Sequence, residues 1–253
     1  MLNKGNSKTT VSMYLRTLRS LFNAAISNND ILPALYPFRK NEYEKGKYEI
    51  PEGSNIKKAL DMADIKKVFT YKTVKGSIKD MSKDYWIFIY LTSGINVKDL
   101  CLLQYEKIEG EKLKFVRAKT ARQKKEKTIE AVLQPEALAI IKKWGNNKKD
   151  GKTFIFQVLT GKESPERQRQ LIQQLTHVIN DNMRAIAEDL RITKPLTTYV
   201  ARHSFATVLK RSGASMELIS EMLGHSNLKT TKNYLASFES ETLKETTKAL
   251  TAF

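Results

Sequence analysis

The sequence predicts a mainly helical protein that carries a small three-stranded antiparallel sheet. Two observations lead to this fold class. Apolar residues recur three and four positions apart in most long stretches of the chain, which is the period of an amphipathic helix. Three short stretches between residues 105 and 132 alternate apolar and polar residues instead, which is typical of half-buried strands. With 253 residues, the chain is long enough for one large domain or for one domain with an appendage.

The first predicted helix covers residues 9–27, and either Thr9 or Thr10 would cap it. Its apolar residues follow helical spacing: Val11, Tyr14, Leu15, Leu18, Leu21, Phe22 and Ala25. Two prolines then stop regular structure, and a charged linker that contains glycine ends near residue 55. Because one helix cannot bury its apolar face alone, this segment has to pack on another element.

The larger domain begins with a helical pattern from Ile56 to Val68. The run from Tyr85 to Leu91 holds too many apolar residues to be amphipathic, which predicts a helix packed on both sides. Gly94 ends this helix, and another helical pattern follows it.

Three strands are predicted at residues 105–108, 113–116 and 128–132, with Glu109-Gly110 as the turn of the first hairpin. Between Lys112 and Lys127 stand eight basic residues and one acidic residue. Such a run is usually a solvated face. In a basic protein it also suits an arm that contacts backbone phosphate.

Further helices are predicted after the sheet. Pro135 suits the first position of a helix that runs to Trp144, and residues 168–190 carry apolar residues at helical spacing. Residues 197–237 predict three short helices, with Ser215 as the N-cap of the second and Gly224 just after its end. A last helix is predicted within residues 239–250.

The charge is the first clue to function. Lys and Arg number 44 against 27 Asp and Glu, so the net charge is +17, which indicates a polyanionic partner such as nucleic acid or, second, a membrane surface. The sequence has no run of about 18 apolar residues, and residues 1–25 lack the apolar block of a signal peptide. The single cysteine, Cys101, rules out an internal disulfide and favours a reducing cytoplasm. We expect no metal and no small-molecule substrate.

The reactive side chains gather near the C-terminus: Tyr199, Arg202, His203, His225 and Tyr234. Attack of a side chain on a phosphodiester needs a nucleophile, positive donors for the phosphate oxygens and an acid for the leaving oxygen, and these residue types supply them. Each of these residues also has a non-catalytic alternative. A lone tyrosine is usually a packing residue, a histidine after glycine can be a turn residue, and the helix-turn-helix pattern of residues 215–235 also suits a DNA-binding motif.

The runs ARHSFAT, LGHS and TTKNYL, in this order and spacing, resemble the tyrosine recombinases, the phage integrase family. The resemblance extends over most of residues 56–240. It implies that Tyr234 is the nucleophile, that Arg202 is the second family arginine, and that His225 takes the position of the family His or Trp. It further implies a tyrosine recombinase catalytic domain at residues 56–238 and a helix or tail at 239–253. Residues 1–50 would be the last part of a helical core-binding domain of the SAM-like type with its linker.

Two positions depart from the family pattern. Asn96 stands where the family has its first catalytic arginine, and Tyr199 stands where it usually has histidine. An amide gives one neutral donor in place of a bidentate charge, and losing such a donor costs about 3–4 kcal/mol in the transition state. Either another cation compensates, with Arg117 and Lys98 as the candidates, or the protein is weakly active. Asp99 fills the family's acidic position, with a surface helix carboxylate as the alternative.

The hairpin supplies the remaining predicted residues. In the family a lysine on this hairpin protonates the leaving 5′ oxygen. Lys119 matches it best, while Lys124 and Lys125 stay open through register error. DNA contacts are predicted for five residues: Arg117, Arg122, Lys124, Lys125 and His203.

The predicted function is site-specific recombination of double-stranded DNA through a 3′-phosphotyrosine intermediate, without cofactor, in the service of a mobile genetic element. Other copies of the chain are the expected partners, as a synaptic tetramer in the family. Two alternatives remain: a DNA-binding protein that keeps the fold with weak or no catalysis, favoured by Asn96 and Tyr199, and an enzyme like a type IB topoisomerase that acts alone on one duplex.

Overall fold

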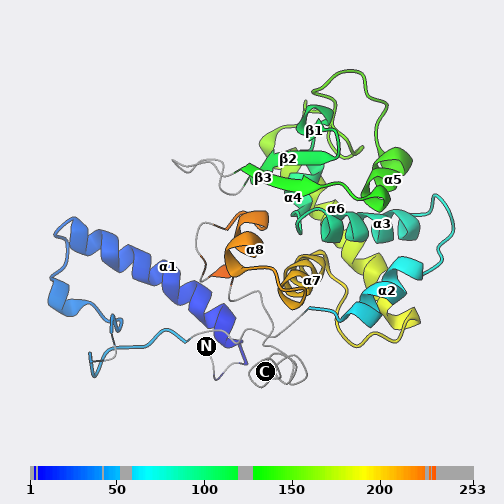
Figure 1. The fold of residues 1–253 in the computed structure, drawn as a ribbon. Helices are drawn as coiled ribbons and strands as arrows, with labels where there is room; N and C mark the ends of the chain where they lie inside the picture. The colour runs from blue at the N-terminus through cyan, green and yellow to red at the C-terminus, as the bar shows by residue number, and fades with distance from the viewer. Residues whose placement is uncertain are drawn as a thin grey trace, which may run out of the picture. The chain divides into compact units, whose positions relative to one another are not determined.

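The computed structural model describes residues 3, 5–41, 43–51, 59–118, 128–225, 228, 230 and 231. The chain divides into two compact units, Met1–Ile56 and Lys57–Phe253, which Figure 1 colours from blue to red along the sequence. No described helix is both long and apolar enough to cross a membrane.

The first unit is built on helix α1, Lys8–Ser27, followed by a short 3-10 helix, η2, at Pro33–Leu35. The N-cap of α1 is Ser7, whose side chain accepts from Thr10 N at 3.1 Å, so the expected cap at Thr9 or Thr10 was wrong. Only part of the predicted apolar face of α1 is covered, because Val11 is 2% exposed whereas Leu21 is 63% exposed.

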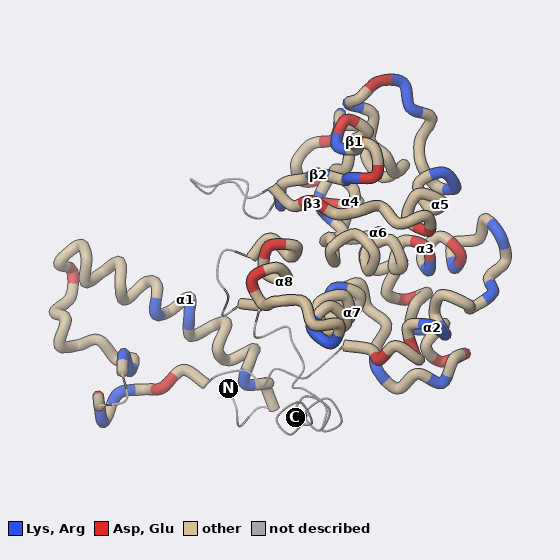
Figure 2. The backbone as a smooth tube through the Cα atoms, in the orientation of Figure 1, with Lys and Arg blue, Asp and Glu red and all other residues tan. Residues whose placement is uncertain are grey.

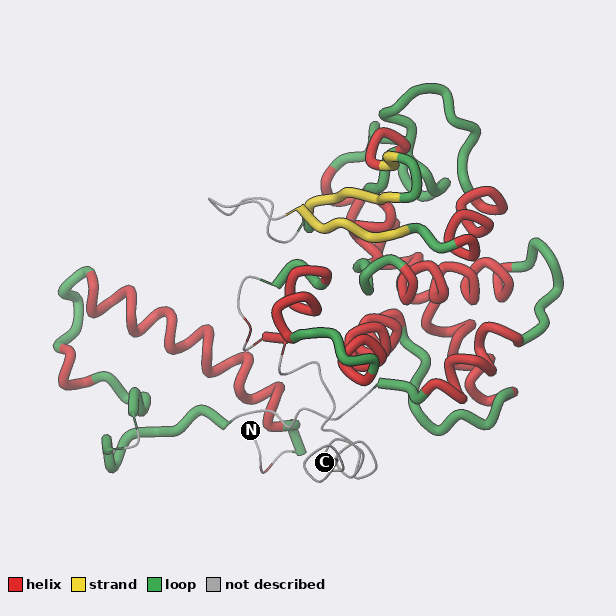
Figure 3. The backbone as a smooth tube through the Cα atoms, viewed as in Figure 1, coloured by secondary structure: helices red, strands yellow, loops and turns green. Residues whose placement is uncertain are grey.

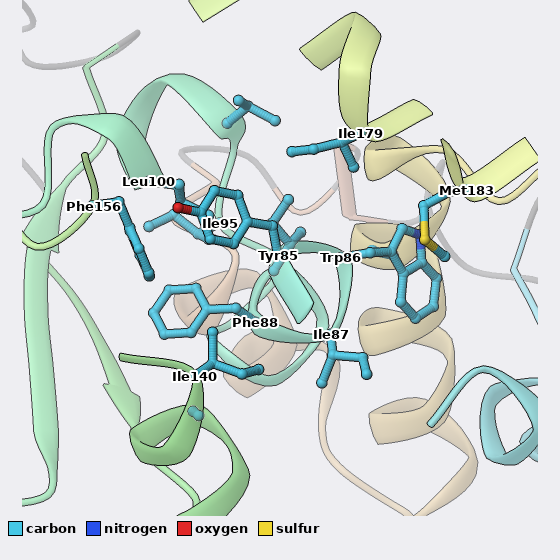
Figure 4. Packing of buried hydrophobic residues seen from close by; sticks show 14 of the residues in the cluster. Tyr85, Trp86, Ile87, Phe88, Ile95, Leu100, Ile140, Phe156, Ile179 and Met183 are labelled. Atoms are coloured by element: carbon cyan, nitrogen blue, oxygen red, sulfur yellow. The ribbon is translucent and has the colours of Figure 1, made fainter. Parts of the chain in front are cut away.

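The second unit is built around helix α3, Ile78–Leu91. Helices α5 (Pro135–Trp144), α6 (Pro165–Asp189) and α7 (Thr198–Arg211) all pack against α3. The residues from Tyr85 to Ile89 are each 5% exposed or less, which confirms the prediction of a helix packed on both sides. Figure 4 shows Phe88 of α3 beside Phe156, with Met183 of α6 near Trp86.

Shorter helices complete this unit: α2 (Met62–Thr70), α4 (Val97–Cys101) and α8 (Met216–Met222). Asp61 caps α2, so the helix expected from Ile56 starts later, and residues 52–58 are outside the described part. Ser215 caps α8 and Gly224 follows it with φ +63°, both as predicted. The third helix expected after α8, and the last one within residues 239–250, fall outside the described residues apart from 228, 230 and 231.

The sheet has three antiparallel strands in the order β1-β2-β3: Ile108–Glu109, Lys112–Val116 and Thr128–Val132. Figure 3 shows them as the yellow segments. Leu113 pairs with Ala131 and Phe115 with Ile129, and all four side chains are buried on one face.

The first predicted strand was wrong at residues 105–107, which form a 3-10 helix, η3 (Tyr105–Lys107). The backbone here is held by long-range contacts rather than by a neighbouring strand. Tyr105 N donates to Thr153 O at 3.1 Å, and Tyr105 Oη donates to Asn146 O at 2.7 Å. Burial does not alternate here either, since Glu106 and Lys107 are both exposed between the half-buried Tyr105 and Ile108.

Candidate active site

Arg202 is the centre of the site. It lies on α7 and is only 2% exposed. Its Nη1 donates to Gly94 O and its Nη2 to Leu223 O, each at 2.6 Å. A buried guanidinium is costly unless its hydrogen-bonding groups are satisfied. Two backbone carbonyls, from the turn after α3 and from the C-cap of α8, therefore hold this side chain in place.

Gly94 is shaped to admit Arg202. Its φ is +59°, a conformation that glycine adopts without steric cost. A Cβ at this position would lie 2.7 Å from Arg202 Cγ, which is closer than real Cβ atoms approach another carbon. The preceding Ser93 also has a positive φ, +54°. The turn after α3 therefore ends the helix and also leaves space for the aliphatic part of the Arg202 side chain.

His225 lies against Arg202 and is 5% exposed. Its Nε2 is 3.2 Å from Arg202 Nη2, and its Nδ1 is 3.0 Å from Thr231 Oγ1. Because a guanidinium can only donate, Nε2 accepts here and Nδ1 carries the proton that is donated to Thr231. The structure therefore brings together two of the residues that the sequence predicts for phosphate binding.

Asp99 joins α4 to the end of β2. Its Oδ1 accepts from Ala118 N at 2.8 Å, and its Oδ2 is 3.4 Å from Asn96 Nδ2. The carboxylate belongs to a residue that is 5% exposed, so the alternative of a surface helix carboxylate is wrong. Asp99 positions the backbone one residue before Lys119. Asn96 is the N-cap residue of α4 but makes no side-chain cap bond.

Arg117 reaches the same carbonyl as Arg202. Its Nη1 is 3.4 Å from Leu223 O, and the side chain is half-buried. Gly224 permits this approach, since a Cβ there would lie 2.9 Å from Arg117 Cδ and 2.5 Å from Ile129 Cδ1. Lys98, the other cation considered for the role of the absent arginine, is exposed.

Tyr199 and His203 lie one helical turn apart on α7. Their rings meet edge to face, with centroids 4.4 Å apart and an interplanar angle of 80°. Tyr199 is 46% exposed and His203 is 7% exposed. The phenol of Tyr199 is therefore exposed to solvent near the start of α7, and the imidazole of His203 is buried against it.

Comparison with known proteins decides the family. Residues 58–241 match the phage integrase family. The chain belongs to this family. That membership confirms the predicted tyrosine recombinase and its enzyme class, a site-specific DNA recombinase.

Relatives of this recombinase agree with the assignment. Tyrosine recombinase XerC of Thermodesulfovibrio yellowstonii is 27% identical over 239 residues, covering 91% of this chain and 72% of the relative. Tyrosine recombinase XerA of Pyrococcus horikoshii is 26% identical over 255 residues, covering 91% and 84%. The integrase of transposon Tn1549, solved in complex with a circular intermediate DNA, superposes with a TM-score of 0.64 at 16% identity, covering 98% of this chain and 82% of that one. This last likeness confirms the recombinase fold.

Several residues predicted for the recombinase site lie outside the described part of the chain: Lys119, Arg122, Lys124, Lys125 and Tyr234. Their roles stay predictions. Within the described ranges, no group of three or more His, Cys, Asp or Glu side chains could hold a metal ion.

Three contributors to the recombinase site were missed by sequence reasoning. Thr231 bonds to His225, Gly94 admits Arg202, and the Leu223 carbonyl receives two guanidiniums. Thr231 could have been noticed as a small polar residue between the His and the Tyr of the motif. A backbone carbonyl has no residue-type signature, so the convergence at residue 223 had no signal in the sequence.

Asp99→Ala is expected to lower stability and slow DNA cleavage, because it leaves Ala118 N without its acceptor. A lost acceptor of this kind costs about 1–3 kcal/mol. Thermal melting followed by circular dichroism measures the first effect and the rate of covalent adduct formation measures the second. Asp181→Ala is the matched control, since Asp181 pairs with Arg184 on the exposed face of α6, and such pairs contribute about 0–1 kcal/mol. Equal melting temperatures for the two variants would contradict the role of Asp99.

Proposed function

We propose that this recombinase cleaves and rejoins double-stranded DNA through a 3′-phosphotyrosine intermediate formed on Tyr234. The single observation that supports it most is the buried pair of Arg202 and His225, held 3.2 Å apart by contacts from three separate segments. Fixed donors in a partly desolvated place stabilise a phosphoryl transition state without reorganisation during the reaction.

The chemical step balances without any added reactant. Tyr234 Oη forms a bond to the scissile phosphorus and releases its proton to water, while the bond from phosphorus to the 5′ oxygen breaks. Lys119 gives a proton to that 5′ oxygen, which leaves as a hydroxyl, and the lysine takes a proton back from water. A 5′ hydroxyl of the partner duplex then attacks the phosphotyrosine and regenerates the phenol. One phosphodiester is exchanged for another, so no nucleotide is consumed.

Phosphate binding would change the hydrogen-bonding role of His225 Nε2 from acceptor to donor. In the present arrangement Nε2 accepts from Arg202. A phosphate oxygen accepts hydrogen bonds and cannot donate them, so Nε2 would have to carry a proton to bind it. Arg202 would keep its carbonyl contacts and turn its remaining donors to the phosphate. Tyr199 would donate a hydrogen bond where the family histidine works, since a phenol of ordinary pKa about 10 is no base near neutral pH.

The proposal extends to partners and organisation. The Tn1549 integrase was solved on DNA, and the +17 charge of this chain suits the same kind of ligand. Figure 2 shows lysine and arginine along α1, α2, α5 and α7. Residues 1–50 would form the end of a core-binding domain, 56–238 the catalytic domain and 239–253 a helix or tail. Assembly with other copies on DNA, contacts from Arg122, Lys124, Lys125 and His203, and a cytoplasmic location stay predictions.

A suicide-substrate experiment tests the function. The protein is incubated with a pool of duplexes of randomised sequence, each carrying a nick that lets a short fragment diffuse away after cleavage. Covalent protein–DNA adducts are isolated and their DNA is sequenced, which also gives the target site. Retention of duplex with no adduct would favour the alternative of a DNA-binding protein without catalysis. Relaxation of supercoiled DNA by the chain acting alone would favour the topoisomerase-like alternative.

DNA affinity is expected to fall steeply with salt. Neutralising phosphates releases counterions, so the logarithm of affinity falls linearly against the logarithm of salt concentration, by about 0.9 per phosphate contact. Fluorescence anisotropy with a labelled duplex between low and moderate salt measures the slope. A flat response would count against an interface that follows backbone phosphate.

A further inference from the structure

The carbonyl oxygen of Leu223 receives donors from two guanidiniums that come from different elements. Arg202 Nη2 approaches it from α7 at 2.6 Å, and Arg117 Nη1 approaches it from the end of β2 at 3.4 Å. The two nitrogens share one acceptor, so their separation cannot exceed the sum of these distances. Two cations at such a distance in a partly buried place repel each other.

Both cations lie at the C-terminal end of α8. Leu223 is the C-cap of the helix, and the last carbonyls of a helix lack partners within the helix and carry partial negative charge. Its carbonyl oxygen has two lone pairs and accepts from both guanidiniums, with Arg202 at the shorter distance. Two guanidiniums brought to one place also suit the doubly negative transition state at a scissile phosphate, because that state needs more than one positive donor.

The backbone at residues 223–225 brings Arg117 and Arg202 close to His225. Leu223, Gly224 and His225 are consecutive, with Arg117 packed on the glycine and Arg202 bonded to the histidine. A side chain at Gly224 would push away both Arg117 and the neighbouring Ile129. The conformation of residue 224, with φ +63°, thus lets Arg117, the residue after β2, lie next to the pair that the proposed function assigns to phosphate binding.

Asn96 connects to Arg117 through a short chain of contacts. Asn96 Nδ2 is 3.4 Å from Asp99 Oδ2, and Asp99 Oδ1 accepts from Ala118 N, the residue after Arg117. Asn96, at the position that lacks the family arginine, and the residue after Arg117 therefore bond to the two oxygens of one carboxylate.

We propose that Arg117 supplies the second phosphate-binding guanidinium that this recombinase lacks at Asn96. The proposal rests on the proposed function, since it concerns the same phosphate. Arg117 would donate to one non-bridging oxygen of the scissile phosphate while Arg202 and His225 hold the other. The cation thus comes from the strand that leads into Lys119 instead of from the start of α4.

Single variants on the target site found with the randomised pool test this role. Arg117→Ala is expected to slow adduct formation by roughly 10²–10³-fold, the loss typical of one transition-state donor, with DNA affinity changed far less. Arg184→Ala is the matched control. Arg184 is an exposed arginine on α6 paired with Asp181, so its removal should leave the rate unchanged.

A neutral substrate separates catalysis from structure. Replacing one non-bridging oxygen of the scissile phosphate by a methyl group removes the charge that the second guanidinium would neutralise. Most of the Arg117→Ala defect should then disappear, whereas a defect from a displaced α8 would persist on both substrates. The double variant Asn96→Arg/Arg117→Ala should regain part of the lost rate on the natural phosphate.

The outcomes separate this inference from the function on which it rests. An unaltered protein that forms no adduct would overturn the proposed function itself. A normal adduct rate in Arg117→Ala, or an equal defect on the charged and neutral substrates, would overturn the role of Arg117 alone. A large gain from Asn96→Arg with Arg117 intact would mean that the first arginine position is unfilled, and would also overturn it.

Discussion

Tyr234→Phe is expected to abolish the covalent protein–DNA adduct while leaving DNA affinity almost unchanged. The substitution removes one oxygen, the proposed nucleophile, and keeps the aromatic ring. Tyr234 is the one side chain proposed to bond to the phosphorus, so the loss should be complete rather than partial. Adduct yield on the nicked substrate and anisotropy on an intact duplex measure the two properties separately.

The control for this variant is another tyrosine that lies far into solvent. Tyr43 is 92% exposed, so Tyr43→Phe removes the same oxygen from the surface and should form the adduct at the normal rate. Peptide mapping of the adduct from the unaltered protein should place the DNA on Tyr234. A normal adduct yield from Tyr234→Phe, or DNA found on a different tyrosine, would overturn the assignment of the nucleophile.

Local chemistry made several elements predictable from the sequence. The uniformly apolar run in α3 predicted its burial on both sides, because no polar stripe was left to face solvent. Pro135 at the start of α5 and the Ser215 cap of α8 were predictable for the same kind of reason, since each acts within one helical turn. These signals do not depend on the rest of the fold.

Tertiary contacts decided the elements that the sequence missed. Residues 105–107 were predicted as part of a strand, yet contacts from Thr153 and Asn146 hold them as a 3-10 helix. The site divides in the same way. The motif predicted that Arg202 and His225 would lie together. The groups that hold Arg202 are the carbonyls of Gly94 and Leu223, and any residue type can supply a carbonyl. The burial of Asp99 likewise depends on the end of β2, far away in the sequence.

Gly94→Ala is expected to slow DNA cleavage strongly, although it changes no charge and no hydrogen-bonding group of the site. The new Cβ would lie 2.7 Å from Arg202 Cγ and 3.0 Å from its Cα, so the side chain of Arg202 or the turn itself has to move. A displaced guanidinium no longer meets the phosphate in the required geometry, and the loss should approach the roughly 10²–10³-fold of a missing donor. Single-turnover cleavage of the nicked substrate measures it.

Gly110→Ala separates this displacement from simple backbone strain. Gly110 has φ +60°, nearly the same as the +59° of Gly94, but a Cβ there would meet nothing within 4 Å. Both variants place alanine in a left-handed conformation, which costs about 1–2 kcal/mol of stability. Only Gly94→Ala also pushes on Arg202. If the two variants lose stability to a similar degree and Gly94→Ala alone loses cleavage, the turn after α3 acts by positioning the guanidinium. Equal cleavage rates would mean that Arg202 does not depend on the space that Gly94 leaves open.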